Sequence, residues 1–347
     1  MISLTSNLTL ALSATITVAL FALLNIKWKS LKNVWVRTIS QLIIQIMLLV
    51  TVGIGLNIQN GFYSSWSDLF GVEKYKSQYI APKTINLSKA KITSNGSAIL
   101  KETFTGKKSH ITSSVWLLLP KPIVQAIKDG ASQKFPVAVF LSGSPGVPTA
   151  WLNGLNLDDQ IKEAQSQSTL GNFIAVLPEF NIIPRTDTGC MNIPGKAKVE
   201  TWLSKDIYNY VINNLPAEIN NWVITGYSTG GWCSTMLALR HPGIFQAAAP
   251  IAGYFRAEFP FKIEKQTREK LREKYDLIRL AKMNPVKILI LSSKEDANSY
   301  ESSNWFYNSI KNTNQVELKS VTNGGHNFST WRPLAQEVLR WFAKESL

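Results

Sequence analysis

The chain has little of several residue types on which catalytic and structural sites commonly depend. Its 347 residues include only two cysteines and three histidines. Two cysteines exclude a disulfide-dense scaffold and a four-cysteine zinc site. Any chemistry that needs histidine must therefore use His110, His241 or His326. With 45% hydrophobic residues, the chain is also too apolar to be disordered.

Charge is scarce as well, and it is unevenly distributed. Charged residues make up 17% of the chain, which is few for an ordinary soluble enzyme. The first 26 residues carry no charged side chain, and the first acidic residue is Asp68. This distribution predicts that part of the chain lies in a membrane.

Two apolar stretches near the N-terminus are long enough to cross a bilayer. Leu8–Ile26 would extend roughly 29 Å as a helix, close to the thickness of the hydrocarbon core. Ile39–Leu56 is also uncharged. It contains Gln41 and Gln45 on one helix face, and we expect that face to pack on the first helix. The alternative for each stretch is a buried core helix.

The loop between the two stretches indicates their orientation. It carries four cations and no acid: Lys27, Lys29, Lys32 and Arg37. By the positive-inside rule this loop is cytoplasmic, so everything after Leu56 is expected outside the cytoplasm. A cleaved signal peptide is the other interpretation, but no positive residue precedes Leu8.

The net charge of +14 describes a strongly basic protein. A basic outer domain would suit anionic lipid headgroups or acidic wall polymers, although a basic surface without a specific partner is the simpler interpretation. The sequence has no arginine-rich helix and no RNA-binding signature, so we expect no nucleic-acid partner.

From residue 90 onward, strand-like runs alternate with helical spacing. Strands are expected at Ile99–Thr105, Ile111–Leu119, Pro136–Leu141, Phe173–Leu177, Trp222–Thr225, Ala247–Ile251, Lys287–Leu291 and Val316–Val321. This alternation predicts an α/β fold with a largely parallel sheet and an antiparallel hairpin at one edge. Helices are expected at Thr201–Asn214 and Trp331–Lys344. The charged segment Phe261–Ala281 is expected to form a helical excursion over the C-terminal edge of the sheet.

The domain organisation follows from these patterns. We expect a two-helix membrane anchor over residues 1–57, an extracytoplasmic connector over 58–89, and a mostly parallel α/β domain over 90–347.

One glycine-rich turn carries a recognisable nucleophile motif. Residues 226–230 read GYSTG and match G-x-S-x-G, with a predicted strand before them and a predicted helix after them. This context indicates a nucleophile elbow that exposes the hydroxyl of Ser228. A serine hydroxyl needs a general base, and His326, after the last predicted strand, is the candidate. His241 and His110 are expected to be structural.

The base needs an acid to orient it. Asp296 is our choice, and the adjacent Glu295 is the alternative, because spacing cannot separate two neighbouring carboxylates. The order Ser228, Asp296, His326 is that of α/β-hydrolases, and each residue follows a predicted strand.

The remaining site residues are predicted from position. The oxyanion hole should combine the N–H group of Thr229 with one from the loop after an earlier strand. Ser144 is our choice there, and its neighbours in that loop are the alternatives. Cys190 and Cys233 form the only disulfide that the chain allows, which would hold one loop beside the site in an oxidising exterior. Two unrelated buried thiols are the alternative. We expect no cofactor and no metal ion.

Taken together, the motifs resemble those of a known family. They are GYSTGG at 226–231, GGHNFSTW at 324–331, the loop 187–190 and VETWLSKD at 199–206. The combination resembles the esterase family of α/β-hydrolases that contains esterase D-like enzymes and the mycolyltransferases of actinobacterial envelopes. It covers about Ser97 to the C-terminus, and residues 62–71 are similar to the connector of membrane-anchored members.

The resemblance implies ester hydrolysis or acyl transfer through an acyl-serine. Residues 146–153 lack the acid and the arginine of the mycolyltransferases' sugar-binding segment, so the resemblance does not extend to trehalose as acceptor. We therefore expect a membrane-anchored esterase of carboxylic esters. One alternative is an envelope acyltransferase using a sugar or lipid hydroxyl, with an envelope lipid as a candidate acyl donor. Another is a catalytically silent binding module, against which the intact triad argues.

Overall fold

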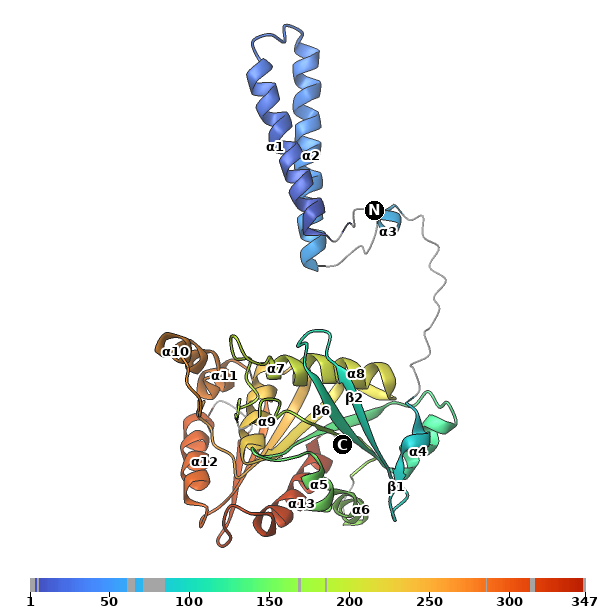
Figure 1. Ribbon diagram of the computed structural model, residues 1–347, viewed down its shortest axis with the longest axis vertical. Helices are drawn as coiled ribbons and strands as arrows, with labels where there is room; N and C mark the ends of the chain where they lie inside the picture. The colour runs from blue at the N-terminus through green and yellow to red at the C-terminus, as the bar shows by residue number, and fades with distance from the viewer. Residues whose placement is uncertain are drawn as a thin grey trace. The chain divides into compact units, whose positions relative to one another are not determined.

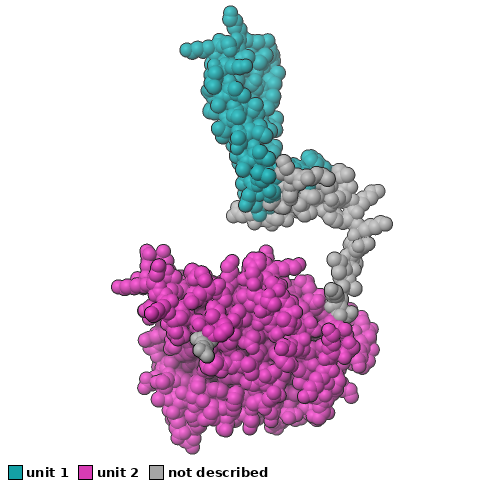
Figure 2. Space-filling model, in the orientation of Figure 1, with its two compact units in different colours: residues 1–80 teal, residues 81–347 magenta. Residues whose placement is uncertain are grey.

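The computed structural model describes residues 4, 6–60, 66–70, 85–167, 170–184, 186–284, 286–312 and 316–345. The chain divides into two compact units, Met1–Ile80 and Ala81–Leu347, which are coloured separately in Figure 2. The predicted boundaries at residues 57 and 89 stay predictions, and most of the predicted connector lies outside the described residues.

The first unit is built on two long apolar helices. Helices α1 (Asn7–Lys27) and α2 (Val34–Asn60) lie side by side (Figure 1), and a short helix α3 (Trp66–Leu69) follows. By length and composition, α1 and residues Val34–Ile58 of α2 can each cross a membrane. Both were predicted from the lack of charge.

The contact between α1 and α2 differs from the predicted one. The hydroxyl groups of Ser13 and Thr51 lie 2.7 Å apart across the helix pair. Gln41 and Gln45, in contrast, are exposed and do not pack on α1. The prediction was wrong because the i,i+4 spacing places two residues on one face but does not identify which face the partner helix covers.

The second unit contains a nine-stranded sheet in the order β1-β2-β3-β5-β4-β6-β7-β8-β9. The strands are β1 (Lys91–Ile92), β2 (Ala98–Thr105), β3 (Thr112–Leu119), β4 (Phe135–Leu141), β5 (Ile174–Pro178), β6 (Ala217–Tyr227), β7 (Phe245–Ile251), β8 (Lys287–Ser293) and β9 (Val316–Val321). Pairing is antiparallel from β1 to β3 and between β3 and β5, and parallel in all other pairs. The predicted hairpin is therefore at the antiparallel edge.

Helices cover both faces of this sheet (Figure 1). They are α4 (Lys121–Lys128), α5 (Thr149–Asn153), α6 (Leu157–Gln167), α7 (Val199–Thr201), the π-helix η2 (Trp202–Ile207), α8 (Tyr208–Asn214), α9 (Thr229–Arg240), α10 (Lys265–Lys274), α11 (Leu277–Met283), α12 (Ala297–Ile310) and α13 (Phe328–Glu345), with a short 3₁₀ turn η1 (Leu87–Lys89) ahead of the sheet.

Two hydrophobic layers hold these helices to the sheet. Val137 and Val139 of β4 belong to the layer that joins the sheet to α4 and to α7–α12. Ala138 and Phe140, which alternate with them, belong to the layer under α5, α6 and α13. Burial on both faces explains why the central strands read as continuous apolar runs in the sequence.

The predicted excursion is helical, as α10 and α11, but its placement differs in part. The cavity at Ser228 is lined by Tyr254, Arg256 and Glu258, which precede the predicted segment, and by no residue of Phe261–Ala281. Further along, Tyr275 donates a hydrogen bond to Glu200 on α7. Helix α11 packs against α9 and α12, whereas the loop before α10 reaches the cavity at Ser228.

Candidate active site

Ser228 lies in the sharp turn between β6 and α9. Its backbone has φ 56° and ψ −124°, a conformation that costs a residue with a side chain about 1–3 kcal/mol. The N–H of Ser228 donates to the carbonyl of Ile251 at 3.0 Å, which holds the turn against β7. A Cβ at Gly226 would overlap the backbone of Gly230, so the close crossing of strand and helix requires glycine there. This is the geometry expected of a nucleophile elbow.

His326 lies within hydrogen-bond distance of this serine. Its Nε2 is 2.9 Å from the Oγ of Ser228. The imidazole comes from the loop between β9 and α13, and it packs edge-on against Trp331 with ring centroids 4.9 Å apart. The side chain is 44% exposed, so the ring borders the solvent-filled side of the site.

Asp296 lies on the other side of the imidazole. Its Oδ2 is 2.6 Å from Nδ1 of His326. Glu295 instead accepts a hydrogen bond at 2.7 Å from the backbone N–H of Gly324, two residues before the histidine. The two neighbouring carboxylates therefore contact different parts of the same loop: one touches the ring, and the other holds the backbone.

The other two histidines lie elsewhere. His110 is in the β2–β3 turn with φ 61°. His241, at the C-terminal end of α9, is 3.0 Å from the carboxylate of Glu200. Glu200 is also bonded to Arg240 and Tyr275. Burial acts to raise the pKa of Glu200, but the hydrogen bonds from His241, Tyr275 and Arg240 outweigh it and lower that pKa to about 2.

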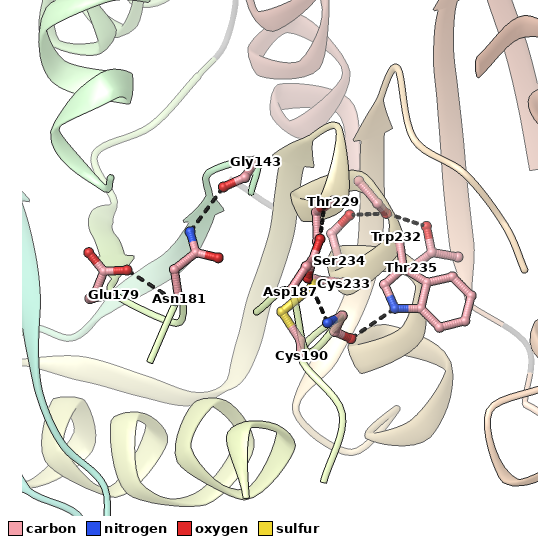
Figure 3. The surroundings of a disulfide bond; sticks show 12 residues. Gly143, Glu179, Asn181, Asp187, Cys190, Thr229, Trp232, Cys233, Ser234 and Thr235 are labelled. Atoms are coloured by element: carbon pink, nitrogen blue, oxygen red, sulfur yellow. Dashed lines mark hydrogen bonds between the residues drawn. A yellow bond between two sulfur atoms is a disulfide. The ribbon is translucent and has the colours of Figure 1, made fainter. Parts of the chain in front are cut away.

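The two predicted oxyanion residues lie on either side of the nucleophile. Thr229 begins α9, where the first N–H groups have no partner within the helix. Ser144 belongs to the turn after β4, and this turn approaches the serine closely, since a Cβ at Gly143 would lie 3.1 Å from Cβ of Ser228. Asn181 holds the turn by donating to the carbonyl of Gly143 (Figure 3) and to that of Gly146. Sequence reasoning missed Asn181, for which an amide three residues after the end of a buried strand was the available signal.

The disulfide between Cys190 and Cys233 is present (Figure 3). It joins the loop after β5 to the second turn of α9. On the same loop, Asp187 accepts a hydrogen bond at 2.7 Å from the hydroxyl of Thr229. The indole of Trp232 donates to the carbonyl of Gly189 at 2.9 Å. The loop is thus attached next to the nucleophile by one covalent bond and two hydrogen bonds.

A cavity of about 680 Å³ opens at Ser228 and His326. Its outer wall includes Arg256, whose guanidinium lies 4.0 Å from the ring centroid of Trp305. Glu258 and Glu301 also line it, so it offers both donors and acceptors. Burial, with a smaller effect from Asp187, raises the pKa of Glu258. Arg256, Glu258 and Glu301 were not predicted to line the site, because they come from separate segments of the chain.

A second cavity, of about 890 Å³, lies along the turn after β4. Ser144 and Val147 line it together with Glu179 and Asp187 from beyond β5. Burial raises the pKa of Glu179, although hydrogen bonds from the backbone of Asn181 and Phe180 oppose this. Among the described residues, no group of three or more His, Cys, Asp or Glu side chains is arranged to hold a metal ion.

The strand order and the position of these side chains define a class of protein. A central strand ends in the nucleophile elbow, the acid follows a strand two places away, and the histidine follows the next strand. This is the α/β-hydrolase arrangement. A family profile described as "Putative esterase" matches residues 114–342, so the chain belongs to this esterase family, whose members are esterases or acyltransferases.

The chain is also similar in sequence to a known protein. An uncharacterized protein of Corynebacterium glutamicum is 22% identical over 249 residues, which cover 64% of this chain and 56% of that protein. The chain thus matches little more than half the length of that relative.

Solved structures are similar over most of the second unit. A ferulic acid esterase superposes with a TM-score of 0.60 at 19% identity, over 72% of this chain and 98% of that one. An S-formylglutathione hydrolase from Agrobacterium tumefaciens gives 0.59 at 14% identity, over 74% and 98%. MPT51 of Mycobacterium tuberculosis gives 0.55 at 14% identity, over 72% and 99%. At these identities the likeness concerns the fold.

Proposed function

We propose that the protein is a membrane-anchored serine esterase that acts on carboxylic esters. The observation that carries this proposal is the continuous hydrogen-bonded chain from Asp296 through His326 to Ser228. A merely structural serine would not need a strained backbone, an adjacent imidazole and an orienting carboxylate at once. The same chain of contacts argues against a catalytically silent binding module.

The first half-reaction forms an acyl-enzyme. Nε2 of His326 takes the hydroxyl proton of Ser228 as the oxygen attacks the ester carbonyl, and Asp296 stabilises the imidazolium. The N–H groups of Thr229 and Ser144 donate to the oxyanion of the tetrahedral intermediate. The imidazolium then gives its proton to the leaving alkoxide, and the alcohol departs.

The second half-reaction releases the acyl group. A water molecule loses its proton to His326 and attacks the acyl-serine, and the proton then returns to Oγ of Ser228. The exposed side of the imidazole supports the access of water that this step needs.

We propose that α1 and α2 anchor this domain to the membrane and that the domain lies outside the cytoplasm. The four-cation loop between the helices supports this orientation through the positive-inside rule. A disulfide next to the nucleophile fits an oxidising compartment. The anchor would bring the site close to esters of envelope lipids.

Acyl transfer to a sugar or lipid hydroxyl is the second candidate. The cavity at Ser228 supports it, because Arg256, Glu258 and Glu301 provide donors and acceptors that could position a hydroxyl-bearing acceptor. In that case the acceptor oxygen replaces water in the second half-reaction, and His326 takes its proton.

The test is turnover of a chromogenic ester by the full chain purified in detergent, with Ser228→Ala as the matched control. Release of the chromophore by the native chain alone supports the esterase. Adding glucose or a long-chain alcohol distinguishes the second candidate: acyl transfer predicts an acylated acceptor and less free acid. Equal turnover by Ser228→Ala would refute both.

A further inference from the structure

Helix α2 presents one row of side chains to α1. Residues of this inner row recur at spacings of three and four: Ser40, Ile44, Met47, Thr51 and Ile54. They are buried or half-buried, and Thr51 meets Ser13 of α1. The spacing is that of two helices packed at a small crossing angle.

A second row runs along another side of α2 with the same spacing. This outer row consists of Val34, Thr38, Gln41, Gln45, Leu48 and Val52. All six side chains are exposed, with Val34 at 68%, Leu48 at 54% and Val52 at 51%. The helix α1 fills the inner row and leaves the outer row open.

The two glutamines make this open row unsuited to contact with lipid alone. Their side chains have no hydrogen-bond partner among the residues that the structure describes. In the hydrocarbon core of a bilayer, water cannot satisfy an amide, and leaving one unpaired is costly. Gln45 is eleven residues past Val34, roughly 16 Å along the helix axis, so it lies too deep in a 25-residue span to reach the interface.

We infer that α2 pairs with α2 of a second copy of this chain through the outer row, with the amides of Gln41 and Gln45 hydrogen-bonded to their counterparts. The inference rests on the proposed membrane anchor. Two copies inserted with the same orientation bring parallel α2 helices together, so each residue meets its own equivalent across a two-fold axis. A side-chain amide both donates and accepts, which makes it complementary to itself. Polar groups of this kind associate helices in membranes and fix their register.

The test is cysteine cross-linking of the full chain in native membranes. Val52→Cys places a thiol on the outer row, and Val50→Cys places one at nearly the same depth but roughly 160° round the helix. The two native cysteines are bonded to each other, so the introduced thiol is the reactive one. Oxidation by molecular oxygen with copper–phenanthroline joins two thiols into one disulfide.

We expect a dimer-sized product from Val52→Cys and little from Val50→Cys. Adding Gln41→Leu and Gln45→Leu to Val52→Cys should lower the yield on the order of ten-fold, and Asn at both positions should restore part of it. Equal cross-linking by the two cysteine variants, a yield unaffected by the leucines, or a product of another size would overturn the pairing.

Each sample is also sedimented with its membranes after an alkaline wash and labelled at Ser228 with a fluorophosphonate. A membrane-bound, labelled protein that gives no Val52→Cys dimer overturns only the pairing. A protein that stays in the supernatant but labels overturns the anchor and the pairing together, and leaves the esterase chemistry standing.

Discussion

At the scale of single residues, the backbone and its hydrogen bonds fix the position of Ser228, the proposed nucleophile. Ser228 has a positive φ, and its N–H is bonded to Ile251 across the sheet. The backbone of Ser228 is therefore held in the turn, with its Oγ 2.9 Å from Nε2 of His326. This predicts that substitutions of the serine or the histidine change the chemistry and leave the fold intact.

Ser228→Ala should abolish covalent labelling by a fluorophosphonate, because it removes the attacking oxygen. His326→Ala should slow labelling by roughly 10²-fold or more, because the serine loses its general base. Gel fluorescence against time measures both, and Ser166→Ala on the exposed side of α6 is the matched control. Undiminished labelling of Ser228→Ala would refute the assignment of the nucleophile.

Mutation should distinguish the roles of the two adjacent carboxylates. Asp296→Asn keeps the shape but favours the wrong imidazole tautomer, and a loss on the order of 10⁴-fold in turnover has precedent in serine proteases. Glu295→Gln should be milder, because an amide oxygen can still accept from Gly324. Ester turnover of both variants, with far-UV circular dichroism as the folding control, decides this. A larger loss for Glu295→Gln would reverse the assignment.

The order of residues along the chain was enough to predict that the fold brings Ser228, Asp296 and His326 together. It was not enough to predict which atoms are in contact. Ser228, Asp296 and His326 each follow a strand, and parallel strands end at one edge of the sheet. Glu295 was indistinguishable from Asp296 because the choice depends on how the first turn of α12 is rotated. Arg256 was not predicted to line the site, because Trp305, the ring it contacts, lies 49 residues further along the chain, on α12.

At the scale of elements, a hydrogen-bond network and a disulfide hold the helices around Ser228. Glu200 on α7 binds Arg240 and His241 at the end of α9 and Tyr275 after α10. The disulfide joins the other end of α9 to the loop after β5. The helix that carries the elbow is thus fixed at both ends.

The hydrogen bonds and ion pair of Glu200 should weaken in acid. The folded-state pKa of about 2 lies below the ordinary value of 4.5, so this carboxylate stabilises the fold above about pH 4.5. That contribution, on the order of 3 kcal/mol, should be lost as the pH falls from about 4.5 to 2.

Urea unfolding at pH 6, 4 and 2.5 tests this on the second unit. Glu200→Gln should be less stable than the native chain at pH 6, and the difference should shrink toward pH 2.5. Glu269→Gln, an exposed change on α10, is the control and should show no such convergence. A difference independent of pH would contradict the assigned cause.

Reduction of the disulfide should loosen the loop 187–192 and lower the melting temperature. The two cysteines are 43 residues apart, and closing a loop of this size is worth about 3–4 kcal/mol in the chain-entropy model. Calorimetry with and without reductant measures the loss, and the Cys190→Ser, Cys233→Ser double variant should be insensitive to reductant. Free thiols in protein recovered from membranes without reductant would contradict the pairing.

At the scale of the whole molecule, the apolar N-terminal unit and the α/β unit were predicted from different features of the sequence. Long uncharged stretches were sufficient to predict α1 and α2, and alternating strands and helices were sufficient for the sheet. The packing side of α2 was not predictable, because it depends on where Ser13 meets Thr51. The path of the loop that contains Tyr254, Arg256 and Glu258, before α10, was not predictable either. The pattern of charges in the sequence does not indicate which of its residues line the cavity.

The topology is testable with reporter fusions. Alkaline phosphatase fused after Leu56 should be active, since it folds outside the cytoplasm, whereas a fusion within the loop at Lys32 should be inactive. Activity measured in whole cells checks both, with fusion levels determined by immunoblot. Activity only for the Lys32 fusion would reverse the orientation.

Strand β6 lies inside the sheet, so the residues proposed for proton transfer and those proposed for oxyanion stabilisation follow strands on opposite sides of it. The strands on one side, β8 and β9, lead to Asp296 and His326, the proposed orienting acid and general base. The neighbour on the other side, β4, leads to the turn of Ser144, the proposed oxyanion donor. Disturbances on the β8–β9 side should therefore change the pH–rate profile, whereas those on the β4 side should lower the rate equally at every pH.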